Sequence, residues 1–525
     1  MELNLQLEAK TAAAQAVVIV VFFLLVPLAL LFHFARAAIS SRDRKTRELI
    51  LSKLPSPPFR LPVIGHVHLI GPLPYVSLLD LAAKHGRDGL MLVRLGSVPT
   101  LVVSSPRAAE AVLRTHDLAF ASRPRSMVTD IIMYGALDSC FAPYSDHFRS
   151  VKKVVTVHLL NSKRVQAYRH VREEEVRLVM ARLRGAAAAA AAVDVSQTLQ
   201  FFANDLICRA VSGKFLCEEG RNKVFRDLME VNSNLLGGFN VEAYFPGLAR
   251  MPLISKLICA RAIRIRRRWD QLLDMLIDDH VSSARDRAKN DDDDDFIHVL
   301  LSLQDEYGFT RDHIKAISID MFEAGTDTSH LVLEYAMVEL IRNPHILTKL
   351  QDEVRRITPK GQQMVTEDDI ADMVYLKAVI KETLRLHAPG GFTIPHLARE
   401  DCNVDGYMIP AGTHVLINLW ALSRDANYWD KPDEFLPERF MDGSNKNTDF
   451  KGQDFQFLPF GSGRRMCPGI YSGKVTLEIM LANLVYCFNW KLPSGMKKED
   501  IDMTDVFGLT IHRKEKLFLV PQVAN

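Results

Sequence analysis

The stretch Phe460-Gly461-Ser462-Gly463-Arg464-Arg465-Met466-Cys467-Pro468-Gly469 ends a glycine-rich run on a single cysteine. Glycines let the backbone turn tightly and approach a bulky partner closely. Backbone N–H groups in such a turn, with nearby guanidinium charge, are expected to favour the thiolate of Cys467 over its thiol. One thiolate presented on a loop of this kind suits the axial position of a haem iron.

Other interpretations of Cys467 stay open at this point. A buried structural cysteine beside a glycine-arginine turn would explain an isolated Cys-Pro-Gly, although the full ten-residue pattern argues against it. Structural zinc usually takes four ligands from C-x-x-C-type pairs, and the sequence contains no such pair. A non-haem role for the cysteine would be decided by metal analysis.

The composition is that of an ordinary globular protein, with 48% hydrophobic and 24% charged residues. A formal net charge of +2 gives no reason to expect nucleic acid as a partner. The seven cysteines are odd in number and lack the spacing of a disulfide framework, which favours a reducing compartment and free thiols.

The N-terminal region reads as a membrane anchor. Residues 12–35 contain no Asp, Glu, Lys or Arg, and this length is enough to cross a bilayer as a helix. Basic residues follow from Arg36 to Arg47, so the positive-inside rule places the rest of the chain in the cytosol. A cleaved signal peptide is the rival interpretation, but it would begin with a basic region and have a shorter apolar core.

Residues 310–341 are expected to form one long helix that ends before Pro344. Thr310 is a suitable N-cap, and we expect no capping box because His313 stands where Glu or Gln would. Two strands are expected at 91–95 and 100–103, and the aperiodic stretch from 120 to 140 is expected to be a loop.

The middle of the long helix reads Ala324-Gly325-Thr326-Asp327-Thr328-Ser329. Gly, Thr and Asp are poor residues for a helix interior, and such a local conflict often marks function. Ala324 and Thr328 share a face, and Gly325 is expected to let a ligand lie against the backbone. The alternative is a kinked core helix whose threonines donate to carbonyl groups four residues back.

Further along, Glu382 and Arg385 stand three residues apart on one predicted helix face, and Arg439 lies in Pro437-Glu438-Arg439-Phe440. A lone pair of this kind carries little information, because exposed pairs are common and contribute little to stability. Its weight comes from the motifs that follow it.

Taken together, these motifs resemble those of the cytochrome P450 family of haem-thiolate monooxygenases, from about Leu54 to the C-terminus. The resemblance implies a mainly α fold with a small β region and haem b between two helices. It also implies a membrane anchor over 1–35, a basic and proline-rich hinge over 36–62, and a haem-thiolate catalytic domain over 63–525.

The resemblance also implies roles for particular residues. Cys467 would be the axial ligand of the haem iron, Asp327 and Thr328 an acid–alcohol pair that delivers protons, and the two arginines with Glu382 a buried triad that braces the haem loop. The residues implied to contact the cofactor, besides the cysteine, are Phe460, Gly463, Arg465, His396, Lys152, Ala324 and Gly325.

The sequence departs from the family pattern at two places. Phe148 and Lys152 replace the Trp and Arg of a W-x-x-x-R motif, and His396 follows Pro395 where many relatives have Arg. The resemblance still implies propionate contacts for Lys152 and His396. A solvated basic helix face is the other interpretation of Lys152. The functional interpretation adds that Lys152 and Lys153 could help to dock an acidic electron donor.

The implied function is insertion of one oxygen atom from O₂ into a small lipophilic plant secondary metabolite. No flavin- or NADPH-binding domain is evident, so electrons are expected from a separate membrane-bound NADPH-dependent reductase at the endoplasmic reticulum membrane. The motifs resemble the plant A-type group, and the tail at 504–510 resembles grass enzymes that hydroxylate indole-derived compounds; phenolic and terpenoid substrates stay open. A haem-thiolate isomerase or dehydratase, and a non-catalytic haem-containing binding or sensor protein, are the alternatives.

Overall fold

The computed structural model describes residues 45–213, 219–237, 240–246, 251–283 and 295–524. The predicted anchor, residues 1–35, lies outside these ranges, as do hinge residues 36–44. Within the described ranges, no helix combines the length and the apolar character that a membrane span requires.

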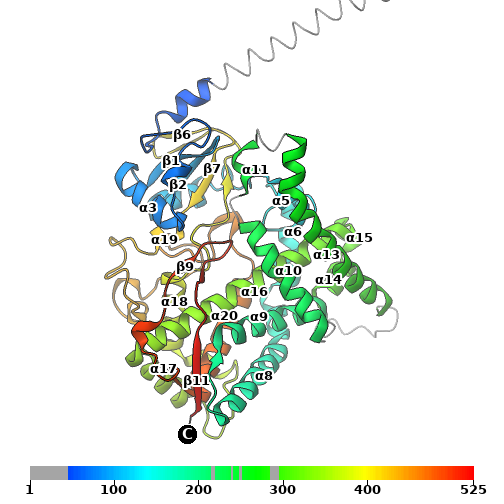
Figure 1. Ribbon diagram of the computed structural model, residues 1–525, viewed down its shortest axis with the longest axis vertical. Coiled ribbons are helices and arrows are strands. Elements are labelled where there is room, and N and C mark those ends of the chain that lie inside the picture. Colours follow the sequence, from blue (N-terminus) through cyan, green and yellow to red (C-terminus); the bar gives the residue numbers. More distant parts are fainter. Residues whose placement is uncertain (1–44, 214–218, 238–239, 247–250, 284–294, 525) are drawn as a thin grey trace, which may run out of the picture.

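A small β region lies at one end of the molecule (Figure 1). Its sheet has the order β1 (Leu90–Leu95), β2 (Val98–Val103), β7 (His414–Ile417) and β4 (His396–Leu397). β2 runs antiparallel to β1 and parallel to β7. Both strands expected from the sequence are therefore present, and they form the β1–β2 hairpin.

The described part of the predicted hinge, residues 45–62, packs against this β region. Leu51 and Leu54 are buried in the same hydrophobic cluster as strand residues, and the amide of Leu92 donates to the carbonyl of Pro55 at 2.7 Å. Glu48 also pairs with Arg94 at 2.6 Å. These contacts hold residues 48–55 of the predicted hinge against the β region.

The larger part of the molecule is helical, as expected (Figure 1). From the N-terminal side its helices are α3 (Pro74–His85), α4 (Pro106–Glu110), α5 (Met127–Ile132), α6 (Asp146–Val154), α7 (Ser162–Ala167), α8 (Arg169–Ala188), α9 (Val195–Ser212), α10 (Glu219–Gly237), α11 (Val241–Tyr244), α13 (Pro252–Ser283), α14 (Phe296–Ser302), α15 (Gln304–Tyr307), α16 (Arg311–Arg342), α17 (Pro344–Ile357), α18 (Val374–Leu386), α19 (Leu419–Leu422) and α20 (Ile470–Cys487). The expected loop at 120–140 contains α5, whose N-cap Ser126 accepts from the amide of Thr129.

The remaining strands make three small sheets. They pair as β3 (Val193–Asp194), β11 (Phe518–Val523) and β8 (Phe488–Lys491); β5 (Cys402–Val404) and β6 (Tyr407–Ile409); and β9 (Asp505–Val506) and β10 (His512–Arg513). Short 3₁₀ turns include η7 (Pro437–Phe440) and η9 (Gly463–Arg465).

Helix α16 runs through the centre of the helical part and packs against α9, α18 and α20. It begins after Thr310 and ends before Asn343, as the sequence predicts. The expectation that its N-terminus lacks a capping box was wrong. The amide of Thr310 donates to Nδ1 of His313 at 3.0 Å, because an imidazole nitrogen can take the acceptor role usually filled by Glu or Gln.

Candidate functional site

The loop that carries Cys467 is held in a tight conformation that depends on glycine. The amide of Cys467 donates to the carbonyl of Phe460 at 2.9 Å, which closes the loop. Gly461 and Gly463 have φ of 70° and 65°, in the left-handed region that favours glycine. A Cβ on Gly463 would stand 2.4 Å from the carbonyl oxygen of Leu113, so this position also excludes a side chain sterically.

Burial raises the pKa of the Cys467 thiol, and a hydrogen bond from Gly469 with the charge of Lys152 acts against this shift. The expectation that guanidinium charge favours the thiolate was therefore wrong for the protein alone. Arg464 pairs with Asp117 at 3.0 Å instead, and Arg465 donates to backbone carbonyls. A coordinated metal ion would supply the charge that removes the thiol proton.

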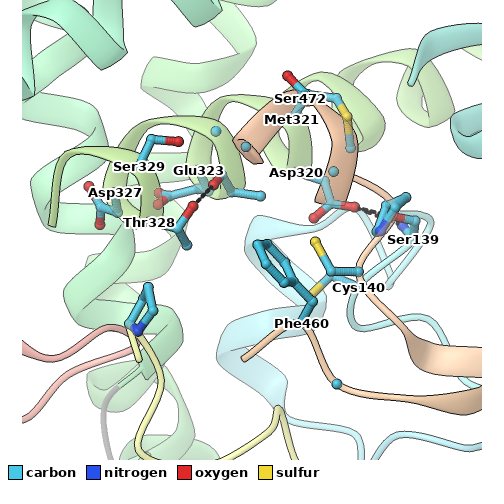
Figure 2. A pocket seen from close by; sticks show the side chains of 18 of the residues that line it. Ser139, Cys140, Asp320, Met321, Glu323, Asp327, Thr328, Ser329, Phe460 and Ser472 are labelled. Carbon is cyan, nitrogen blue, oxygen red and sulfur yellow. Dashed lines mark hydrogen bonds between the residues drawn. The ribbon is translucent and has the colours of Figure 1, made fainter. Parts of the chain in front are cut away.

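A cavity of about 360 Å³ lies between this loop and α16. Cys467, Phe460 and Arg465 line it from the loop, and Ala324 and Thr328 line it from the helix. Figure 2 shows Phe460 and the middle of α16 around this space. Ala324 is exposed in the middle of an otherwise buried helix, because its side chain borders the cavity.

The motif at residues 324–329 of α16 agrees in part with the alternative interpretation, in which threonines donate to carbonyl groups four residues back. The hydroxyl of Thr328 donates to the carbonyl of Ala324 at 2.6 Å, four residues back. A Cβ on Gly325 would stand 2.6 Å from Cδ1 of Ile207, so this glycine allows close packing against α9. Gly325 still lines the cavity, as does Asp327 (Figure 2).

One end of the cavity is rich in buried cationic side chains. Arg465 donates to the carbonyls of Ala121 and Ala142, both at 2.6 Å, and its Nη1 is buried without a partner among the described residues. Burial and the neighbouring Arg123 lower the pKa of Arg465 to about 9. This is an unused donor beside the cavity.

Arg123 is a site residue that the sequence interpretation missed. It is buried, lines the cavity, and donates to the carbonyls of Cys140, Ile394 and Pro395. Burial lowers its pKa to about 10. A single arginine in an aperiodic stretch gives no local signal that it will be buried.

His396 is buried beside this cluster. Its Nδ1 is 2.9 Å from the carbonyl oxygen of Phe120, and it also lines the cavity. Burial and the charge of Arg123 lower the pKa of His396 well below its ordinary value, so the imidazole is neutral at neutral pH. Its single N–H is on Nδ1, which donates to the Phe120 carbonyl, so the uncharged ring leaves Nε2 free only to accept a hydrogen bond.

Lys152 does not lie on a solvated helix face. It is half-buried, lines the cavity, and donates to the carbonyl of Met466 at 2.5 Å. Burial lowers its pKa. Phe148, one turn earlier on α6, lies under the guanidinium of Arg465 at 3.7 Å from its ring centre. Phe148 and Lys152, which replace the Trp and Arg of the family motif, therefore both contact the Cys467 loop.

Glu382, Arg385 and Arg439 form a buried ion triad. Arg385 holds Glu382 through two hydrogen bonds of 2.8 Å, and Nε of Arg439 donates to the same carboxylate at 3.0 Å. Glu382 and Arg385 are fully buried. Because the carboxylate also accepts from the amide of Leu436, its oxygens are well satisfied.

Aromatic packing connects the triad to the cysteine loop. The guanidinium of Arg385 lies 5.3 Å from the ring centre of Trp429, which contacts Phe457 at 6.1 Å. Phe457 contacts Phe450 at 6.3 Å, and Phe450 contacts Phe460 at 5.4 Å. A change at the triad can therefore reach Phe460 through side chains in direct contact.

Two buried carboxyl groups, Asp320 in the cavity wall and Asp138 next to wall residues Ser139 and Cys140, were missed by the sequence interpretation. Asp320, on α16, accepts from the amide and hydroxyl of Ser139 (Figure 2), at 3.1 and 2.5 Å. Asp138 accepts from the amides of Cys140 and Phe141. Burial and their mutual repulsion raise the pKa of Asp138, to about 7, and burial raises that of Asp320.

These residues fit a haem. Two cysteines line the cavity, Cys140 and Cys467. Burial and the charges of Asp320 and Asp138 raise the pKa of Cys140 well above its ordinary value, whereas Gly469 and Lys152 favour the thiolate of Cys467, so Cys467 is the better metal ligand. The described residues contain no cluster of three or more His, Cys, Asp or Glu that could hold another metal ion. Nη1 of Arg465 is a buried donor suited to an anionic group such as a propionate. A cysteine sulfur on a glycine-rich loop, an adjacent cavity and an unused cationic donor together fit a haem held by a thiolate.

The chain belongs to the cytochrome P450 family, since a sequence model described as "Cytochrome P450" matches residues 55–520. It is 58% identical over 527 residues to an indole-2-monooxygenase of Zea mays, covering 99% of this chain and 98% of that protein. It is 52% identical to a 3-hydroxyindolin-2-one monooxygenase of Zea mays, covering 89% of this chain and 88% of that protein. An indolin-2-one monooxygenase of Zea mays is 50% identical, covering 93% and 92%.

Solved structures agree on the fold. A zebra fish cytochrome P450 determined with progesterone matches with a TM-score of 0.73 at 23% identity, covering 86% of this chain and 99% of that one. A second zebra fish structure, with abiraterone, matches with a TM-score of 0.70, covering 86% and 100%.

The protein is therefore a haem-thiolate monooxygenase that acts on a secondary metabolite and has haem b as its cofactor. As a member of this family it uses O₂, a lipophilic substrate and electrons that reach it from NADPH through a reductase. The isomerase and sensor alternatives are set aside by the family and by its monooxygenase relatives.

Proposed function

We propose that the protein inserts an oxygen atom into a small indole-derived bicyclic compound. The observation that carries this proposal is the 58% identity, over almost the whole chain, to an indole-2-monooxygenase, with two further relatives named for indolinone substrates. The apolar part of the cavity lining, which includes Ile207, Leu236 and Leu509, also supports it, because such a lining suits a small aromatic compound beside the haem.

In this proposal Cys467 would hold the haem iron through its sulfur, and the haem, when bound, would supply the activation of O₂. Arg465 and Arg123 would hold the propionate end by hydrogen bonds, with His396 buried beside them, and Lys152 fixes the Cys467 loop through the carbonyl of Met466. Phe460 packs beside the loop, and the glycines let the cofactor lie close to the backbone.

Asp327 and Thr328 are proposed to move protons on the α16 side of the cavity. The Thr328 hydroxyl donates to the Ala324 carbonyl, which leaves its oxygen free to accept a proton donor such as water. Asp327 can relay protons from solvent to the cavity, because its side chain is half-exposed and also borders the cavity. Ala324 leaves room above this pair.

The test is oxidation of indole by the full-length protein with an NADPH-dependent reductase, NADPH and O₂. We expect a product one oxygen atom heavier, labelled when ¹⁸O₂ is supplied and absent without NADPH. Indole and indolin-2-one left unchanged, while other lipophilic compounds are oxidised, would contradict the proposed substrate class and leave the monooxygenase assignment intact.

We also propose that residues 1–35 anchor the protein in the endoplasmic reticulum membrane, with residues 36–62 as the hinge and 63–525 as the cytosolic catalytic domain. The uncharged run at 12–35 and the basic residues after it support this. Removing residues 1–44 should release the protein from sedimented membranes and retain its haem spectrum, since Glu48 and Leu51 are kept. A shortened protein that still sediments fully would contradict the anchor.

The reductase is proposed to dock on the basic surface near Cys467. Arg149 and Lys153 on α6 are exposed there, and Arg464 is about half exposed on the cysteine loop. Lys152 is not part of this surface, because its ammonium group is directed to Met466. Docking of an acidic partner at this face should weaken as ionic strength rises.

A further inference from the structure

Glu323 is a buried carboxyl group in the cavity wall, and none of the roles described above uses it. It stands on α16 one residue before Ala324, is only 7% exposed, and lines the cavity (Figure 2). Its Oε1 accepts a hydrogen bond from Nδ2 of Asn232, a fully buried residue of α10. Its Oε2 is buried and has no partner among the described residues.

This arrangement costs stability, because a buried polar atom without a partner loses its hydration and gains nothing. The nearby cavity wall is apolar, with Ile207, Leu236 and Leu509 among its lining residues. A leucine would fill such a position at lower cost. The carboxyl is therefore a candidate for a group that finds its partner only in a ligand.

The protonation state of Glu323 decides which of its two carboxyl oxygens can donate a hydrogen bond. Burial and, to a smaller extent, the charge of Asp327 raise the pKa of Glu323 well above its ordinary value, which favours the protonated, uncharged carboxyl. Since Oε1 already accepts from Asn232, the proton belongs on Oε2. A protonated Oε2 is a hydrogen-bond donor, and among the described residues neither it nor Oδ1 of Asn232 has an assigned partner.

We propose that Glu323, oriented by Asn232, positions the substrate by donating a hydrogen bond from Oε2 to a carbonyl oxygen on it. The preferred ligand is then an indole-derived bicycle that carries a carbonyl group, such as a lactam of the indolin-2-one type. A lactam also offers an N–H to the second lone pair of Oε1, which would give a two-point contact. This deepens the proposed function and rests on it for the compound class used as probe.

The first test uses the unaltered, haem-loaded protein. Calorimetric titration compares indolin-2-one with indoline, which keeps the bicycle and the N–H but lacks the carbonyl oxygen. A single buried hydrogen bond should make indolin-2-one bind about tenfold more tightly. Equal affinities, or tighter binding of indoline, would overturn the proposal without any substitution.

Variants then locate the contact. Glu323→Leu should remove the preference for indolin-2-one, whereas Glu323→Gln should retain most of it, because an amide N–H₂ can replace the hydroxyl donor while its oxygen still accepts from Asn232. Asn232→Leu, which releases the carboxyl, should reduce the preference at least about threefold. These results would support the assignment if the variants retain haem.

Thr393→Val is the matched control, since Thr393 also lines the cavity and its Oγ1 is also buried without a partner among the described residues. It should leave the preference unchanged. A preference that survives in Glu323→Leu, or that is lost only in Thr393→Val, would overturn the role of Glu323. If indole compounds are turned over but carbonyl-bearing ones are not preferred, the role of Glu323 is contradicted and the proposed function stands. If carbonyl-bearing compounds bind preferentially but none is turned over, only the proposed function is contradicted.

Discussion

At the scale of single residues, the hydroxyl of Thr328 is the most direct test of the proposed proton delivery. Valine has nearly the same shape and lacks the oxygen. We expect Thr328→Val to bind substrate normally and to consume NADPH, but to form at least about tenfold less product per NADPH consumed, because proton delivery would lose its hydroxyl. The measurement is the ratio of product to NADPH under saturating substrate.

Thr326→Val provides the control in the same helix. The hydroxyl of Thr326 is buried, has no partner among the described residues, and does not belong to the cavity lining. Its removal should therefore leave the product yield unchanged. Equal yields in Thr328→Val and the unaltered protein would contradict the role given to Thr328.

Asp138 gives a prediction about pH. Its pKa is raised to about 7 from an ordinary value of 3.8, so between these values the native state keeps a proton that the unfolded chain has released. This carboxyl therefore lowers the free energy of unfolding as pH rises through that window. In Asp138→Asn the amide oxygen can still accept from Cys140 and Phe141, and no charge appears.

We expect Asp138→Asn to gain stability relative to the unaltered protein as pH rises from 5 to 7.5, by roughly 2 kcal/mol. The thermal unfolding midpoint of the haem-loaded protein, measured at both pH values, checks this. A difference between the two proteins that stays constant with pH would contradict the buried-carboxyl interpretation.

At the scale of elements, two neighbouring glycines of the cysteine loop should respond differently to alanine. Both have positive φ, but a Cβ on Gly463 would meet the carbonyl oxygen of Leu113, whereas one on Gly461 would meet nothing within 4 Å. Gly463→Ala should abolish haem incorporation, and Gly461→Ala should cost only the backbone strain of roughly 1 kcal/mol. Haem content per protein measures both, and equal losses would show that space at Leu113 does not matter.

The buried triad predicts a second contrast. Glu382→Ala leaves two buried guanidinium groups without their carboxylate, which costs roughly 3–5 kcal/mol, so little or no haem-loaded protein should form. Glu434 also pairs with a basic residue three positions away, Lys431, but both side chains are more than half exposed. Glu434→Ala should therefore be nearly neutral. Normal haem loading in Glu382→Ala would contradict the bracing role.

The elements show which features are readable from sequence and which are not. The extent of α16, the β1–β2 hairpin and the cysteine loop depend on local signals, such as caps, alternation and glycine spacing, and all are present. The orientation of Gly325 toward Ile207 and the capping by His313 depend on packing and side-chain geometry that no local pattern carries. For that reason the expected absence of a capping box was wrong, and the close packing of Gly325 against Ile207 was not foreseen, although Gly325 also lines the cavity.

The same limit applies to the site. Cys467, Phe460, Thr328 and the triad follow from motifs, and the structure brings the first three to one cavity and the triad behind it. Arg123, the Asp138 and Asp320 carboxyls and the pair of Glu323 with Asn232 do not follow from motifs. Each is defined by burial or by a contact between elements distant in sequence, such as α10 and α16.

At the scale of the whole molecule, the cavity joins parts that are far apart in the chain. Its wall takes residues from the loop before α5, from α6, from α16, from β4 and from the cysteine loop. The triad and the aromatic contacts from Trp429 to Phe460 support that loop from behind. Loss of the cofactor should therefore accompany loss of this support, even when the cysteine itself is unchanged.

The central claim is that Cys467 ligates a haem iron as a thiolate, and the carbon monoxide difference spectrum of the reduced protein tests it most directly. We predict the long-wavelength Soret band of a thiolate–iron–carbonyl complex in the full-length protein, and its loss in Cys467→Ala. Haem-loaded protein without this band, or a band that survives in Cys467→Ala, would contradict the assignment of Cys467 as the axial ligand.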